Sequence, residues 1–141
     1  MRSVTWFARI SIFIIYFWFG YLKIIGTSPA ESLVHELFNI TLFNLTSFKT
    51  FAICFGIFEC LIAISWLIPK LTFIAYYAVI IHVIFTFVPI IALTELTWTS
   101  TFTPTIIGQY IIKNLLLLSC IMFIKENYKL GLEEEEEEEE E

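Results

Sequence analysis

The chain has 141 residues, of which 58% are hydrophobic and only 16% are charged, and its mean hydropathy is +0.82. A soluble enzyme or a secreted disulfide scaffold of this length could not bury so many apolar side chains, because a small domain has a high ratio of surface to volume. The formal net charge of −6 comes from the C-terminal run Glu133–Glu141, and the basic remainder has no cluster with interleaved aromatic residues, so nucleic acid is not an expected partner.

Four long apolar stretches follow one another, each close to the roughly 20 residues that a helix needs to cross about 30 Å of hydrocarbon. None alternates between apolar and polar residues as a membrane β-barrel strand does, so helices that pair their own backbone groups are expected. The sequence predicts an all-α fold, a four-transmembrane-helix bundle over residues 1–130. Its spans are Trp6–Ile25, Phe48–Ile68, Leu71–Leu93 and Ile106–Ile124.

A short amphipathic helix is predicted between the first two spans. Ser28 can cap it, Pro29 suits its first turn, and Glu31 completes a capping box. One face would carry Leu33, Val34, Leu37 and Phe38, and the other Glu31, Ser32, His35, Glu36 and Asn39. We expect this helix at the outer membrane interface, either as a plain connector or as a lid over the bundle.

Capping residues and prolines mark other boundaries. Thr46 and Ser47 can cap the second span, and Pro69–Lys70 ends it. Thr103–Pro104 offers a cap and a first-turn proline to the fourth span, and the intervening segment from 94 to 105 is expected to be a loop. Pro89 is expected to kink or fray the end of the third span.

Positive charge is distributed unevenly between the two sides of the membrane. If the spans alternate in direction, Lys23 and Lys49 lie towards one side, and five basic residues lie on the other: Arg2, Arg9, Lys70, Lys125 and Lys129. Positively charged loops stay in the cytoplasm, so we expect both termini there. Residues 131–141 form a poly-Glu tail, expected to be disordered by self-repulsion and typical of an engineered or added segment.

The three cysteines are isolated within apolar runs. Cys54 and Cys60 would lie about 240° apart around one helix and cannot face each other. A thiol oxidoreductase needs a resolving pair, so we interpret these residues and Cys120 as small buried hydrophobes.

A few polar side chains lie within the predicted spans, where charge is costly and often functional. Glu59 is the only acidic residue in the four apolar stretches. His82 is at the middle of the third span, and the remaining candidates are near the outer half of the bundle. The candidate ligand-binding or proton-exchanging residues are Lys23, Glu59, His82, Gln109, Lys113 and Asn114.

Each candidate charge shares a helix face with small or polar residues. These faces are formed by Ala52, Gly56, Glu59 and Ala63; by Ala75, Ala78, His82, Thr86 and Pro89; by Gly20 and Lys23; and by Gln109 and Lys113. Small residues allow helix backbones to approach, so we expect all four faces to point inward. The candidates would then converge in the outer half of the bundle.

This convergence predicts an ion pair between Glu59 and Lys113. The pair either only stabilises the bundle, or it forms the centre of a site that binds a ligand or a proton. Lys23 either belongs to this site or extends its ammonium group to the outer surface. His82 is a core histidine, a proton exchanger or a haem ligand. No metal-ligand spacing is present, so no metal site and no catalytic residue is assigned.

The runs Phe17–Lys23, Gly56–Glu59, Pro69–Leu71 and Gly108–Asn114, together with His82, resemble the DoxX-like family of small four-helix bacterial membrane proteins. The resemblance covers most of residues 6–125 and implies a multi-pass protein of the bacterial inner membrane. Some relatives are linked to quinone-coupled oxidoreductases, such as the small subunit of thiosulfate:quinone oxidoreductase, or to membrane complexes in redox homeostasis. Four of the candidates fall where the family pattern has polar positions: Lys23, Glu59, His82 and Lys113.

The leading hypothesis is a membrane subunit that binds a quinone-like or small amphipathic ligand and supports a redox complex. Lys113 and Gln109 would donate hydrogen bonds to a carbonyl oxygen, while Glu59 or His82 exchanges a proton. No intrinsic cofactor other than a bound quinone is expected, so electrons would come from a soluble or membrane oxidoreductase partner. The alternatives are a small proton-coupled transporter component and a structural bundle that stabilises a partner complex.

Overall fold

The structure is a computed structural model that describes residues 2–41 and 46–140. Within these residues, four helical segments are long and apolar enough to cross a membrane, as the sequence predicted. They correspond to α1 (Arg2–Ile24), α3 (Phe48–Trp66), α4 (Thr72–Ala92) and the pair α6 (Ile106–Ile112) and α7 (Asn114–Glu140). The chain therefore has the architecture of a multi-pass membrane protein.

The four spans share one apolar core. α1 contributes Ile12, α3 contributes Trp66, α4 contributes Val79, and α7 contributes Ile121 and Ile124. The outward faces are also apolar: Phe7 is 74% exposed and Leu116 is 73% exposed. Such surfaces suit contact with lipid, and the polar side chains that lie inside suit a protein whose solvent is hydrocarbon.

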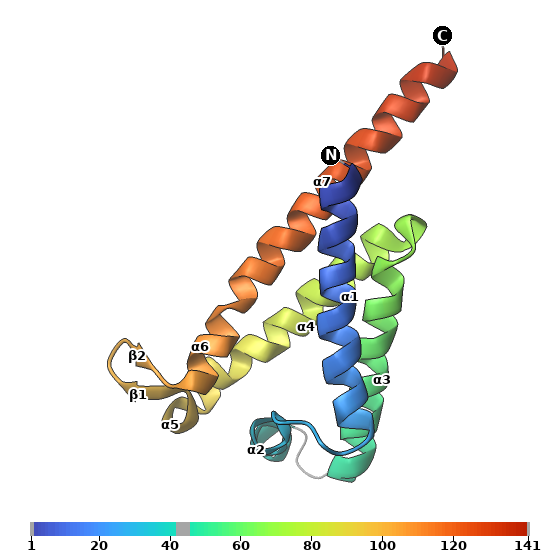
Figure 1. The fold of residues 1–141 in the computed structure, drawn as a ribbon. Helices are drawn as coiled ribbons and strands as arrows, with labels where there is room; N and C mark the ends of the chain where they lie inside the picture. Colours follow the sequence, from blue (N-terminus) through green and yellow to red (C-terminus); the bar gives the residue numbers. More distant parts are fainter. Residues whose placement is uncertain (1, 42–45, 141) are drawn as a thin grey trace.

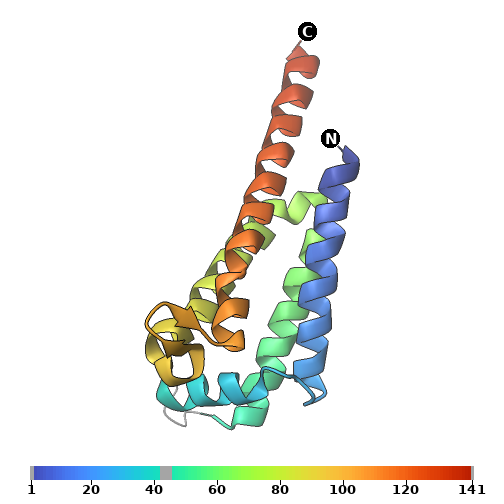
Figure 2. The same ribbon diagram turned by 60° about the vertical axis from the view of Figure 1, so that its left-hand side comes forward.

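Both termini point towards the same end of the molecule, and the shorter elements gather at the other (Figures 1 and 2). We refer to these as the terminal end and the loop end. The loop end holds α2 (Glu31–Thr41), α5 (Thr94–Thr97) and a two-stranded antiparallel hairpin of β1 (Trp98–Ser100) and β2 (Thr103–Pro104). The 3-10 helix η1 (Pro69–Leu71) joins α3 to α4 at the terminal end.

The amphipathic pattern predicted for α2 is confirmed. Phe38 is buried, Leu33, Val34 and Leu37 are half-buried, and the polar residues of the opposite face are exposed. Phe38 packs against Phe48 and Phe51 of α3, with ring centroids 5.7 and 5.1 Å away. The helix starts at Glu31. Just before it in the chain, the Ser28 hydroxyl accepts a hydrogen bond from the Ala30 backbone N–H.

The hairpin changes one predicted boundary. Thr103 and Pro104 form β2 rather than the start of the fourth span, and Thr105 caps α6 by accepting a hydrogen bond from the Gly108 N–H at 3.2 Å. Ser47 caps α3 as predicted, by accepting from the Thr50 N–H. Pro89 lies inside α4, which continues to Ala92 before it ends.

The fourth span also differs from a single helix ending at Ile124. Lys113 interrupts it between α6 and α7, and α7 then continues through the glutamate run as far as Glu140, where disorder was expected (Figure 1). Glutamate has a good helix propensity, and the Lys129–Glu133 ion pair of 3.1 Å joins the run to the preceding turn.

Candidate functional site

The site begins at a close crossing of α1 and α3. A Cβ atom on Gly20 would lie 2.7 Å from the backbone oxygen of Gly56 and 3.0 Å from the Cβ of Glu59. Real Cβ atoms do not approach a backbone oxygen so closely, so only glycine permits this contact. Lys23 and Glu59 each follow one of these glycines by three residues, which brings them together across the crossing.

The end of α1 fixes the position of Lys23. Gly26 has a φ of 70°, a conformation that glycine adopts without a steric penalty. Its N–H donates to the Lys23 carbonyl oxygen, and the Thr27 N–H donates to the Leu22 carbonyl oxygen. This is a Schellman arrangement, which ends the helix and turns the chain towards α2.

Four buried side chains then form one hydrogen-bonded network, which we refer to as the Glu59 network: Tyr16, Lys23, Glu59 and His82. Lys23 Nζ donates to Glu59 Oε2 at 2.7 Å, and His82 Nε2 lies 3.0 Å from Glu59 Oε1. The Tyr16 hydroxyl lies 3.1 Å from His82 Nδ1. Three helices, α1, α3 and α4, therefore meet at a single carboxylate.

If Glu59 is ionised, hydrogen-bond chemistry defines the donors in this network. An ionised carboxylate only accepts, so His82 Nε2 would carry the hydrogen that faces Glu59, and Nδ1 of the neutral ring would accept from the Tyr16 hydroxyl. The network thus joins an imidazole, a carboxylate and a phenol, all of which are groups that can donate or accept protons.

Aromatic rings shield the network from its surroundings. Phe55 stacks on His82 with ring centroids 5.4 Å apart, and Lys23 Nζ lies 5.5 Å from the Phe55 centroid. Phe55 also stacks on Phe51 at 5.7 Å, which connects the network to the aromatic contacts of α2. The row of rings runs along α3 from the loop end to His82, and the low local polarity strengthens each charged hydrogen bond.

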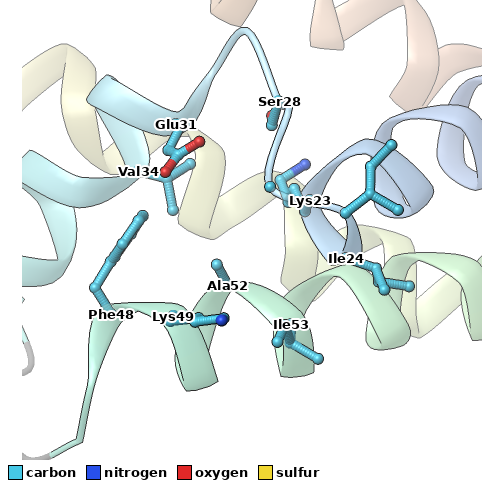
Figure 3. Close-up of a pocket in the computed structure, with 11 residues that line it drawn as sticks. Lys23, Ile24, Ser28, Glu31, Val34, Phe48, Lys49, Ala52 and Ile53 are labelled. Carbon is cyan, nitrogen blue, oxygen red and sulfur yellow. The ribbon is translucent and has the colours of Figure 1, made fainter.

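A pocket of about 370 Å³ opens beside the network at the loop end. Its lining comes from the end of α1, the connection to α2, α2 itself and the start of α3. Figure 3 shows Glu31 and Val34 of α2 opposite Phe48 and Ala52 of α3, with Lys23 at the end of α1. Lys23 thus contacts both the pocket and the buried carboxylate.

The structure brings together only part of the predicted site. Lys23, Glu59 and His82 meet, but the Glu59–Lys113 ion pair is not formed, and Lys23 and His82 bind the two oxygens of Glu59 instead. Lys113 and Gln109 are exposed, and the Lys113 ammonium lies 5.0 Å from the Tyr110 ring centroid.

Lys113 and Gln109 face outward because of the way α6 packs. Gly108 and Ile111 take the buried face, and a Cβ on Gly108 would collide with the Thr97 carbonyl oxygen. The neighbouring positions 109 and 113 are therefore turned outward. Asn114 is half-buried and donates to the Thr86 hydroxyl at 3.1 Å, which links α7 to α4 away from Glu59.

Some buried polar residues were not predicted as candidates from the sequence, among them Tyr16 and Arg9. Tyr16 belongs to the Glu59 network, and Arg9 is 3% exposed near the terminal end. Arg9 Nη1 donates to the Trp66 carbonyl oxygen at 3.1 Å and Nη2 to the Thr72 hydroxyl at 2.6 Å. The signal was present: Arg9, Tyr16 and Lys23 recur every seven residues, which places them on one face of α1.

The described part of the chain contains no group of three or more His, Cys, Asp and Glu residues that could hold a metal ion. Cys54, Cys60 and Cys120 are free thiols. Cys60 lies near the crossing of α1 and α3, where its Sγ is 3.8 Å from the Phe17 carbonyl oxygen. No protein-family model, curated protein or solved structure matches this chain.

Proposed function

We propose that the chain is a membrane subunit that binds a small amphipathic, quinone-like ligand in the pocket between α1, α2 and α3. One observation carries this proposal: Lys23 lines the pocket and at the same time pairs with the buried carboxylate of Glu59 at 2.7 Å. A ligand oxygen bound at Lys23 would therefore lie one side chain away from a network that can exchange a proton.

The residues of the pocket suit such a ligand. Its volume is near the lower end of the roughly 300–1,000 Å³ typical of small-molecule sites, and Ile24, Val34, Phe48 and Ile53 offer an apolar surface to a ring. An ammonium group has three N–H donors. Lys23 gives one to Glu59, which leaves donors for a carbonyl oxygen.

A bound quinone would supply a carbonyl oxygen that takes up a proton when the ring is reduced. Lys23 would orient this oxygen, and Glu59 or His82 would take up a proton from water at the loop end and pass it on, with Tyr16 keeping His82 in the correct orientation. Electrons would come from a soluble or membrane oxidoreductase partner. The resemblance to the DoxX-like family favours the same assignment and, with the positive charges at the terminal end, an inner-membrane orientation with both termini in the cytoplasm.

A proton-coupled transporter is the second candidate, and the Glu59 network is the feature that favours it. Between this network and Arg9, however, the described core consists of apolar side chains such as Ile12, Ile62 and Val79. Because this packing offers no polar route across the bundle among the described residues, it favours a proton that enters and leaves at the loop end over one that crosses the membrane. A purely structural bundle is the third candidate, in which matched neutral residues could replace the ion pair without functional loss.

Photoaffinity labelling tests the proposal. The full chain in lipid nanodiscs is exposed to an azido-benzoquinone with a short alkyl tail, and labelled residues are mapped by mass spectrometry. We expect labelling around Phe48 and Ile53. Lys23→Met should raise the concentration for half-maximal labelling about tenfold or more, because a charged hydrogen bond is lost. Ala52→Trp should block the pocket and abolish labelling.

The matched control is Lys70→Met, an exposed cation in η1, which should label as the unaltered chain does. Because Lys23→Met leaves Glu59 with one partner fewer, the double variant Lys23→Met/Glu59→Gln provides a second protein that should fold and also label weakly. Labelling that is spread over lipid-facing residues and is unaffected by Ala52→Trp would contradict the proposed site. Proton flux in liposomes that contain this chain alone would favour the transporter.

A further inference from the structure

A second polar feature lies on the outside of the bundle, away from the pocket. Gln109 and Lys113 are exposed on α6 and at the α6–α7 junction. Their neighbours on the surface are large and apolar or aromatic: Ile106 is 71% exposed, Tyr110 65% and Leu116 73%. We refer to these five residues as the Lys113 face.

The position of Lys113 along the span makes this exposure unusual. Thr105 caps α6, and Lys113 follows eight residues later, about 12 Å below the cap at a rise of 1.5 Å per residue. Its ammonium group lies 5.0 Å from the centroid of the Tyr110 ring. A lysine close to a helix end can reach water with its long side chain, but the backbone of Lys113 lies about two turns after the start of α6.

Among the described residues, the contact that the bundle offers this charge is the ring of Tyr110 rather than a carboxylate. Within the described residues, Glu59 is bound by Lys23 and His82, and it is the only acidic residue of the four apolar stretches. Ionisable side chains in membrane helices almost always face the protein interior, where they find partners. An exposed lysine beside an exposed glutamine therefore indicates that another protein surface covers this face in the membrane.

Charge complementarity identifies the partner. A second copy of this chain would present Lys113 to Lys113, and its one acid within the apolar stretches is already buried and paired. We propose that the Lys113 face binds a transmembrane helix of a different protein, one that carries a carboxylate at the depth of Lys113. Gln109, four residues earlier, adds a second interhelical hydrogen bond, and Ile106 and Leu116 provide the apolar contact.

This assignment is independent of the ligand proposed for the pocket, because the face and the pocket share no residue. It predicts a partner helix that is apolar except for one Asp or Glu in the half of the membrane nearer the loop end. Interhelical hydrogen bonds between model helices in lipid contribute about 1–2 kcal/mol, which corresponds to about a tenfold preference for such a helix.

The test uses two designed probes. Each is a dye-labelled Leu/Ala helix with flanking tryptophans; one carries a glutamate eight residues from its loop-side end, and the other carries a glutamine there. Association with the full chain in liposomes is measured by energy transfer. We expect the unaltered chain to bind the Glu probe about tenfold more tightly than the Gln probe. Lys113→Leu should abolish this preference, and Lys113→Arg should keep it.

Lys70→Leu is the matched control, since it removes an exposed cation of η1. This element lies at the terminal end, so the preference should be unchanged. Lys113→Leu places an apolar side chain on a lipid-facing position, and its circular dichroism should match that of the unaltered chain. Equal binding of the two probes, or a preference that survives Lys113→Leu, would overturn the proposal. A Tyr110→Cys variant offers a second check. If it forms a disulfide between two copies of the chain, and neither probe lowers the yield of this cross-linked dimer, the proposal would be overturned in favour of self-association.

Discussion

Removal of the Lys23 side chain is expected to leave the buried carboxylate of Glu59 without its cationic partner and to destabilise the bundle. The side chains of Lys23 and Glu59 are only 9% and 5% exposed, so the lost partner would leave the carboxylate poorly solvated. In Lys23→Met, Glu59 retains only the hydrogen bond from His82. Breaking a buried ion pair by removal of one partner costs about 3–5 kcal/mol, and we expect this loss in the free energy of unfolding.

The double variant Lys23→Met/Glu59→Gln separates charge from packing. It removes both charges, while the amide oxygen that it introduces in place of the carboxylate still accepts a hydrogen bond from His82. We therefore expect the double variant to lie within about 1 kcal/mol of the unaltered chain. The coupling energy between the two positions should be about 3 kcal/mol, well above the roughly 0.6 kcal/mol that interhelical hydrogen bonds contribute on average in a membrane protein.

The measurement is reversible unfolding in mixed micelles of increasing dodecyl sulfate content, followed by far-ultraviolet circular dichroism. Lys129→Met is the control, because the Lys129–Glu133 pair is about half exposed at both ends, and we expect no measurable change. A Lys23→Met variant as stable as the unaltered chain would refute the reasoning. So would a double variant whose loss equals the sum of the two single losses, because the positions would then be uncoupled.

Three further predictions use the same unfolding assay or hydrogen exchange. Gly56→Ala should cost about 1–3 kcal/mol by overpacking against α1, whereas Gly131→Ala, with nothing within 4 Å of its new Cβ, should be neutral or slightly stabilising. Arg9→Lys should cost about 1.5–3 kcal/mol, because one ammonium cannot replace two guanidinium hydrogen bonds across α3 and α4; an unchanged stability would argue against that clamp. Phe38→Ala should speed exchange within α2 while Ile40→Ala, at an exposed position, should not, and equal effects would contradict the packing of α2 on α3.

The close crossing of α1 and α3 explains how a membrane protein of this size can hold a charged group beside a pocket. Gly20 and Gly56 bring two backbones together, and the side chains that follow them by one turn are forced into contact. The same helix ends at Ile24, one residue after Lys23, and Gly26 turns the chain away. One short stretch of sequence therefore supplies the helix contact, the cation and the turn that opens the pocket.

Local properties of the sequence were sufficient for much of this description. Apolar length predicted the four spans, because a helix in lipid must satisfy its own backbone and cover about 30 Å. Helical spacing predicted which face of each of α1, α3 and α4 turns inward, and the small residues of those faces are buried or half-buried. The amphipathic stripe of α2 followed from the same periodicity.

The tertiary structure alone decided which charges meet. Periodicity places residues around one helix axis, but it carries no information on which helix lies opposite or how far each is rotated. The packing of Gly108 against the Thr97 carbonyl turned Lys113 outward, and the glycine crossing brought Lys23 to Glu59 instead. Contacts between backbones of distant segments, rather than any local preference, therefore chose the partner of the buried carboxylate.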